Sequence, residues 1–129
     1  MRKMILLLLL PFGYVLLLNV GFANHCPPPP DVTQAIQCGL RTIDGFTIPQ
    51  VKPGTNIVKE FIKADMFDFA SGRAVFCIYG IGNDTVALEL KGPFRTDNPR
   101  FWKATMFDKY CGPYLTGGFL LDCTWRIEK

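Results

Sequence analysis

The chain has 129 residues, of which 49% are hydrophobic, and its 14 Lys and Arg stand against 11 Asp and Glu. This length fits one domain and leaves no room for two. A net charge this close to zero excludes electrostatic attraction as the main drive toward nucleic acid or an anionic membrane.

The first 23 residues have the pattern of a secretory signal peptide. Arg2 and Lys3 form a short basic start, and an apolar segment follows over residues 4–18. Gly21 and Ala23 are small residues at the −3 and −1 positions of a cleavage site before residue 24. The apolar segment has about 15 residues, fewer than the roughly 20 needed to cross a bilayer. A cleaved leader is therefore preferred over an uncleaved anchor.

Removal of residues 1–23 would leave residues 24–129 as a single exported domain, periplasmic or secreted. The leader carries two of the basic residues, so 12 basic residues face 11 acidic ones in the remainder. We expect this domain to bind no nucleic acid and to meet a membrane only through the leader, before cleavage.

All five cysteines lie after the leader, where disulfides are normal and stabilise a fold by roughly 2–4 kcal/mol each. They are Cys26, Cys38, Cys77, Cys111 and Cys123. No Cys-x-x-Cys pair occurs, so a structural zinc site has no support. Because the number is odd, one thiol stays free or pairs with another chain.

The sequence leaves the disulfide pairing open. Equal spacing favours Cys26–Cys38 and Cys111–Cys123, each pair twelve residues apart. A hairpin centred near residues 114 and 115 would not bring the second pair together, which makes that pair doubtful. Cys77 and Cys123 both fall in strand-like segments, so a bridge between neighbouring strands is an equal alternative.

The start of the exported domain predicts a stiff lead-in and a short helix. Four prolines follow Cys26 and favour a polyproline stretch. Asp31 and Gln34 resemble a capping pair, and Gly39 is a stop signal, so we expect a helix over residues 32–38. Glycines and prolines between residues 45 and 54 predict a loop.

From residue 57 onward the pattern is that of strands. Val86, Leu88 and Leu90 alternate with polar or small residues, which is the period of a half-buried strand. Turn residues separate such segments, notably over residues 70–73 and 82–84. The predicted strands cover residues 61–69, 74–81, 86–91, 101–107 and 119–127. The sequence therefore predicts an all-β fold, a small antiparallel sandwich or barrel of five to six strands, disulfide-stapled, with a short N-terminal helix.

The residue types permit little catalysis. The exported part has one histidine, His25, and one serine, Ser71. Without an interior histidine, Ser-His catalysis, Cys-His catalysis and His-based zinc hydrolysis are excluded. The remaining acid–base candidates, which we expect to be solvated charges on sheet faces, are Asp65, Asp68, Glu89, Asp108 and Asp122. We predict no catalytic residue, no cofactor and no enzymatic activity.

A chelate at the new N-terminus is the one metal site that the residues suggest. The α-amine of Asn24, the His25 imidazole and the Cys26 thiolate could together hold Cu(II) or Ni(II). This site requires a free Cys26, whereas a disulfide is the preferred interpretation, so we predict no metal site.

Basic and aromatic residues interleave near residue 100 and form the candidate partner-binding segment. Arg95, Arg100 and Lys103 flank Phe101 and Trp102, a mixture that can hold a glycan or an acidic protein surface. The preferred interpretation is nevertheless that an aromatic residue here belongs to the core, because one face of any strand must be buried.

Three short motifs together resemble a group of small exported bacterial domains of unknown function. They are Cys26-Pro27 at the start, Cys77-Ile78-Tyr79 in a central strand, and Cys123-Thr124 in the last strand. The resemblance implies an exported β fold and brings no activity or catalytic residues. Cys38 has no counterpart in the pattern of these domains, which makes it the candidate for the unpaired thiol.

We therefore expect an exported, non-enzymatic binding or interaction domain for an extracytoplasmic protein or glycan. An inhibitor, an envelope accessory protein and a host-directed factor all fit. The alternatives are a carboxylate-dependent exported hydrolase and a structural envelope subunit. Asn83 is a formal N-glycosylation acceptor and matters only if the export pathway is eukaryotic.

Overall fold

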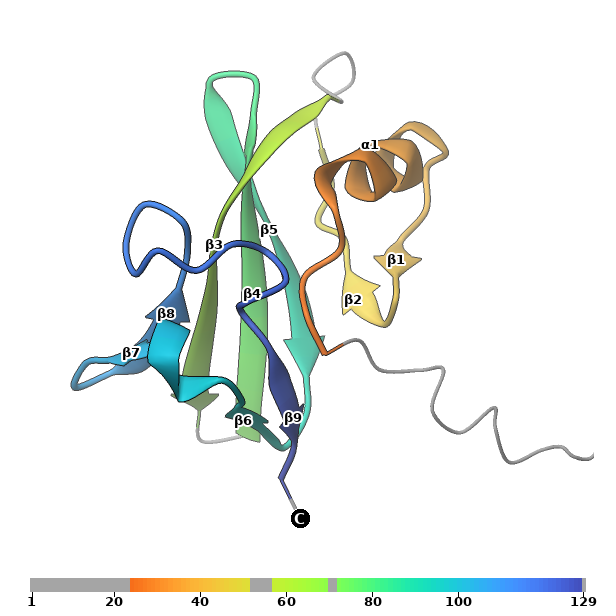
Figure 1. Cartoon of the computed structure of the whole chain (residues 1–129). Coiled ribbons are helices and arrows are strands. Elements are labelled where there is room, and N and C mark those ends of the chain that lie inside the picture. The colour runs from red at the N-terminus through yellow and green to blue at the C-terminus, as the bar shows by residue number, and fades with distance from the viewer. Residues whose placement is uncertain (1–23, 52–56, 70–71, 129) are drawn as a thin grey trace, which may run out of the picture.

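The computed structural model describes residues 24–51, 57–69 and 72–128, so the leader predicted over residues 1–23 lies outside the described residues. Within these ranges the chain forms one α-helix, a seven-stranded antiparallel sheet and a two-stranded sheet (Figure 1). The helix α1 spans Pro29–Gln37, and a short 3-10 turn, η2, spans Pro99–Phe101. The strands are β1 (Thr42–Ile43), β2 (Phe46–Thr47), β3 (Val58–Phe69), β4 (Gly72–Ile81), β5 (Asp84–Lys91), β6 (Phe94–Thr96), β7 (Lys103–Ala104), β8 (Asp108–Cys111) and β9 (Trp125–Ile127).

Three long strands, β3, β4 and β5, form the centre of the large sheet, whose order is β1-β2-β5-β4-β3-β8-β7. Buried and more exposed side chains alternate along β4 from Val75 onward and along β5 from Val86 onward. This is the period of two that predicted β5, because successive side chains point to opposite faces of a sheet. The buried set lines one face, which carries the core.

One row of the core face holds both disulfides. Cys77, Ala64 and Cys111 lie side by side on β4, β3 and β8, and all three are fully buried. Cys77 is bonded to Cys26, and Cys111 is bonded to Cys123. The small side chain of Ala64 therefore lies between two bridges that fasten the chain ends to the sheet.

The two ends of the described chain cover this core face (Figure 1). The β6–β9 ribbon brings in Trp125, whose ring packs edge-on against Phe46 and Phe94 at centroid distances of 6.0 and 6.5 Å. The Trp125 backbone N–H donates to the Asn24 carbonyl at 3.0 Å, so the first described residues run beside β9.

The proline-rich lead-in is anchored by more than its disulfide. The buried Tyr79 hydroxyl donates to the Pro27 carbonyl at 2.6 Å. Burial raises the pKa of this phenol strongly. The predicted helix is confirmed, but it begins at Pro29, and no side chain caps its N-terminus. Prolines are tolerated in the first turn of a helix because the N–H that they lack would have no partner there.

The predicted fold class is confirmed: the protein is all-β and antiparallel, with a short N-terminal helix and two disulfides. The described strands outnumber the five to six expected because β1, β2, β6 and β7 are only two or three residues long. Strands this short leave no periodic signal. The turn expected over residues 70–73 falls partly outside the described residues.

Two predicted strands were wrong in part. Residues 101–107 form the end of η2, the two-residue strand β7 and a turn. Of residues 119–127, only the last three form a strand, β9, and the exposed Phe119 and Leu121 do not share the buried face of Trp125. The alternating pattern there is coincidental, because local hydrogen bonds hold residues 119–123 in a turn.

Candidate functional site

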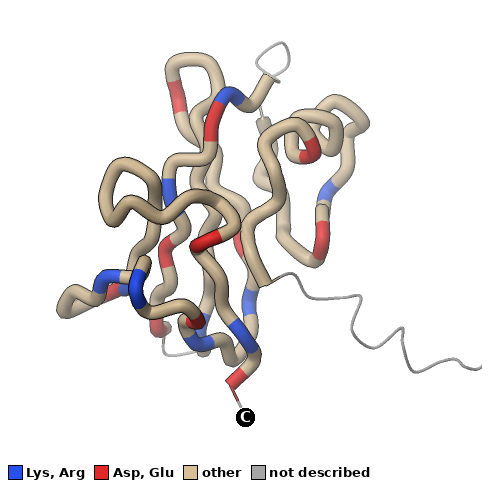
Figure 2. Tube along the Cα trace, in the orientation of Figure 1, with Lys and Arg blue, Asp and Glu red and all other residues tan. Residues whose placement is uncertain are grey.

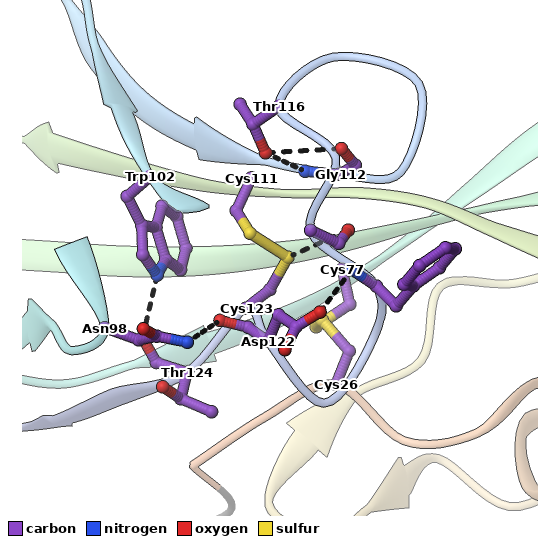
Figure 3. Close-up of a disulfide and its surroundings, with 12 residues drawn as sticks. Cys26, Cys77, Asn98, Trp102, Cys111, Gly112, Thr116, Asp122, Cys123 and Thr124 are labelled. Atoms are coloured by element: carbon purple, nitrogen blue, oxygen red, sulfur yellow. Dashed lines mark hydrogen bonds between the residues drawn. A yellow bond between two sulfur atoms is a disulfide. The ribbon is translucent and has the colours of Figure 1, made fainter. Parts of the chain in front are cut away.

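The two aromatic residues of the predicted binding segment contribute to the packing of the domain's own core. Phe101 and Trp102 are half-buried and pack against the core cluster. The Trp102 indole N–H donates to the Thr124 carbonyl at 2.9 Å (Figure 3). Arg100 lies over the Phe101 ring, with its guanidinium carbon 5.4 Å from the ring centroid. These rings therefore do not form an exposed stacking platform.

The basic half of that segment is exposed but divided between two strands. Arg95 lies on β6 directly opposite Arg126 on β9, and both point away from the core. Arg100 and Lys103 lie by η2 and β7 instead. The three basic residues thus lie on three different elements, β6, η2 and β7, and a shared binding surface stays a prediction.

Three of the candidate carboxylates, Asp68, Asp108 and Asp122, are engaged with neighbouring groups. Asp68 pairs with Arg73, and Asp108 accepts a hydrogen bond from the Thr105 hydroxyl. Asp122 caps a turn, as described below. Glu89 is half-buried on β5, in register with Phe76 on β4.

Asp65 is the one buried carboxylate in the described core. Its Oδ2 lies 3.0 Å from the Lys63 ammonium, and its Oδ1 has no hydrogen-bond partner among the described residues. Burial raises the pKa of Asp65, the Lys63 hydrogen bond and charge oppose the rise, and the nearby charge of Asp108 adds to it. Asp65 and Asp108 thus lie close enough for their charges to interact.

The loop between β8 and β9, residues 112–122, exposes several large apolar side chains. Its large side chains, Tyr114, Leu115, Phe119 and Leu121, are 50–75% exposed. Asp122 is the only charged residue in the loop. Exposed apolar side chains gathered in this way mark interaction sites more often than isolated ones do.

The first half of the loop is fixed by its own hydrogen bonds and by the Cys111–Cys123 disulfide that closes it (Figure 3). The Gly112 carbonyl accepts from the backbone N–H of Thr116 at 3.0 Å and of Leu115 at 3.2 Å. The Thr116 hydroxyl also bonds both the N–H and the carbonyl of Gly112, at 3.3 Å each. This half is therefore a closed turn.

The second half is a capped turn. The Asp122 carboxylate accepts from the Phe119 N–H at 3.0 Å, and the Asp122 N–H donates to the Phe119 carbonyl at 2.8 Å. The Asn98 side-chain amide donates to the Asp122 carbonyl at 3.1 Å, which ties this turn to the segment before η2 (Figure 3).

Close packing holds the middle of the loop against the domain. A side chain on Gly118 would place its Cβ 2.8 Å from the Cys111 sulfur and 3.0 Å from the Phe101 Cβ. A Cβ on Gly112 would lie 2.5 Å from the Ile62 carbonyl oxygen. Both positions require glycine, so the loop approaches the sheet at two points.

One apolar side chain of the loop has a polar anchor on the sheet. The Tyr114 hydroxyl donates to the Glu60 carboxylate on β3 at 2.8 Å, and this bond raises the pKa of Tyr114. The ring remains 75% exposed. The loop thus offers apolar groups to solvent in fixed positions, which lowers the entropy cost of binding a partner.

Sequence reasoning expected a hairpin turn near residues 114 and 115 and assigned residues 119–122 to a strand with a buried face, so it missed the exposed loop. The signals that could have identified it are Gly112-Pro113 and Gly117-Gly118, which were interpreted only as the ends of a turn, together with the twelve-residue spacing of Cys111 and Cys123. The doubt about that disulfide was wrong, since no hairpin forms between its cysteines.

The remaining cysteines and the N-terminal chelate are now placed. Cys26 is bonded to Cys77, which removes the thiolate that the predicted chelate needs. Cys38, at the C-cap of α1, is an exposed free thiol. In the described ranges, no three His, Cys, Asp or Glu side chains gather as a metal site would require.

Comparison with family models, with curated proteins and with solved structures gave no match. Two disulfides indicate an oxidising, extracytoplasmic environment. Within the described part of the chain, no helix has the length and apolar character to cross a membrane.

Proposed function

We propose that this protein is an exported, non-enzymatic binding domain, and that its loop 112–122 docks into an apolar groove on a partner protein outside the cytoplasm. The supporting observation is the exposure of four large apolar side chains on a loop that a disulfide, two turns and two glycine contacts hold in place.

The chemistry of the loop favours a protein over other partners. Aromatic and aliphatic groups without basic neighbours suit the apolar core of a protein interface. An acidic glycan or nucleic acid would need basic side chains, and the loop contains none. A carboxylate-dependent hydrolase is the less favoured alternative, because Asp65, Asp68, Asp108 and Asp122 already have neighbouring partners.

The test is site-specific photo-crosslinking in cells that export the protein. A photoreactive amino acid at Phe119 should capture one partner protein as a defined adduct. The matched control carries the same group at Leu40, which is 53% exposed in the link between α1 and β1, and should give no such adduct. Equal adducts at both positions, or none at Phe119, would contradict the proposal.

Binding by the purified partner gives the second measurement. Replacing Leu115 and Phe119 by serine should weaken that binding by at least about tenfold, since interface anchors of this kind contribute 1–2 kcal/mol or more each. Thermal unfolding and disulfide content should stay unchanged, because both side chains are exposed. Unchanged affinity in this variant would refute the role of the loop.

A further inference from the structure

The most exposed large apolar side chains in the described protein lie at the tip of a different element, the β7–β8 hairpin. Met106 and Phe107 are 88% and 80% exposed. They occupy the turn between the two short strands, and the hairpin projects from the edge of the large sheet at β7 (Figure 1). Exposing large apolar side chains to water at a projecting tip is unfavourable in free energy, and packing within the domain does not explain it.

The turn presents these two residues in a fixed way. The Thr105 N–H donates to the Asp108 carbonyl at 2.7 Å. The Thr105 hydroxyl accepts from the backbone N–H of Phe107 at 3.2 Å and of Asp108 at 3.1 Å. The polar groups of the turn thus bond one another, and the tip offers mainly its apolar side chains to the outside.

Basic residues stand just behind the tip. Lys103 on β7 is in register with Tyr110, and Lys109 on β8 is in register with Ala104. Because side chains in register share a face and successive ones alternate, the two lysines lie on opposite faces of the ribbon. Both are exposed, and Arg100 in η2, three residues before Lys103, adds a third positive charge. Figure 2 shows basic positions in blue along this hairpin.

The spacing along the strands matches the depth of a lipid headgroup layer. Lys109 is two residues from Phe107, and Lys103 is three from Met106. Residues 105–107 form a turn, in which the chain advances less than the about 3.3 Å per residue of a strand, so the charges lie at most roughly 7–10 Å behind the tip. Apolar groups of peripheral proteins sink about 5–10 Å into the boundary of headgroups and acyl chains.

We propose that the β7–β8 hairpin is a membrane-surface anchor, with Met106 and Phe107 inserted between lipids and Lys103 and Lys109 against anionic phosphates. A bilayer fits better than a second protein, because two side chains on a narrow tip cover far less than the roughly 800 Å² per partner of a stable protein interface. The sequence led us to expect that a near-zero charge excludes attraction to an anionic membrane and that the domain meets a membrane only through its leader. Charges more than about 10 Å away are largely screened at about 0.1 M salt, however, so a local positive excess can act without a net charge on the whole domain.

The charge balance around the tip also favours an anionic surface. Over residues 100–109 three basic residues face one acid, Asp108, which is half-buried and bonded to Thr105. The other nearby acids, Asp68 and Asp65, are paired with Arg73 and Lys63. The tip therefore carries a local excess of positive charge.

The experiment is vesicle flotation of the purified, oxidised protein. Vesicles of phosphatidylcholine with about one third phosphatidylglycerol should bind the protein, pure phosphatidylcholine should bind it much less, and added salt should weaken the binding. Met106→Ser with Phe107→Ser should reduce binding at least about tenfold. Lys103→Gln and Lys109→Gln should each reduce it roughly fivefold.

Leu40→Ser is the matched control, because Leu40 is also an exposed apolar residue but precedes β1, at the opposite edge of the sheet from β7. It should bind like the unchanged protein. The proposal is refuted if anionic vesicles bind no protein, if pure phosphatidylcholine binds as well, or if the tip variants bind normally. Since Phe119 is not part of the hairpin, crosslinking there tests the proposed function separately.

Discussion

Opening the Cys111–Cys123 disulfide should destabilise the domain less than opening Cys26–Cys77, and should loosen a different part of it. A disulfide restricts the unfolded chain, and the effect grows with the length of the loop that it closes. The two bridges join residues 12 and 51 positions apart. The chain-entropy relation then gives about 3 kcal/mol for the first and about 4 kcal/mol for the second.

Urea unfolding of the two paired Cys→Ala variants measures this difference. The Cys111→Ala, Cys123→Ala variant should lose about 3 kcal/mol, equivalent to about 12 °C in the melting temperature of a domain this size. Amide exchange at Thr116 and Phe119 should speed up in this variant and stay slow in the Cys26→Ala, Cys77→Ala variant, because only the first bridge closes the loop.

The control is Cys38→Ser, which should change stability by less than about 0.5 kcal/mol because this thiol is exposed and unpaired. The reasoning is refuted if the Cys111 and Cys123 variant loses more stability than the Cys26 and Cys77 variant. It is also refuted if exchange in the loop stays slow without its disulfide, since the turns alone would then hold it.

Three further predictions concern buried and exposed groups. Tyr79→Phe should cost about 1–3 kcal/mol in urea unfolding, because it leaves the buried Pro27 carbonyl without a donor; a loss below 0.5 kcal/mol, on the order of experimental error, would contradict this. Asp65 has a raised pKa in the fold, so its contribution to stability is present at acid pH and is lost as the pH rises through that pKa. Asp65→Asn should therefore gain about 1 kcal/mol relative to the unchanged protein at neutral pH, with Lys63 turning to solvent, and the gain should vanish near pH 3; parallel pH profiles would refute this. Alkylation of the folded, non-reduced protein should add one label, at Cys38, as read by intact mass, and two or more labels would show that a disulfide is absent.

The long strands and the helix were predictable because their signals are local and repeated. The alternation at Val86, Leu88 and Leu90 extends over a whole strand, and each of these side chains is buried as expected. Gly39 marked the end of α1 correctly, but its start was missed, because Asp31 and Gln34 resemble a capping pair whereas the helix begins at Pro29 without a side-chain cap. The short strands β2 and β6 depend on partners far along the chain, β5 and β9, and two or three residues contain no period to detect.

The candidate loop could not be predicted, because its pattern imitates a buried strand. Phe119, Leu121 and Trp125 have the spacing of one face, yet only Trp125 is buried. The deciding interactions are the Asp122 cap and the disulfide between Cys123 and Cys111. The spacing of these two cysteines in the sequence left it in doubt whether they lie close together. The exposure of Phe119 is thus set by hydrogen bonds and a disulfide that the apolar pattern of the sequence does not reveal.

The order of the bonded cysteines along the chain has a consequence for survival among proteases. The disulfides close two consecutive rings, residues 26–77 and 111–123, which neither overlap nor interlock. A single backbone cut inside either ring leaves the two fragments covalently joined. A cut at Leu115 in the projecting loop would therefore add one water to the mass but release no peptide, and the cut ends would stay attached to β8 and β9. Outside the rings, the connection over residues 78–110 has no such protection, so a cut there would separate the chain into two fragments, each still holding a closed ring.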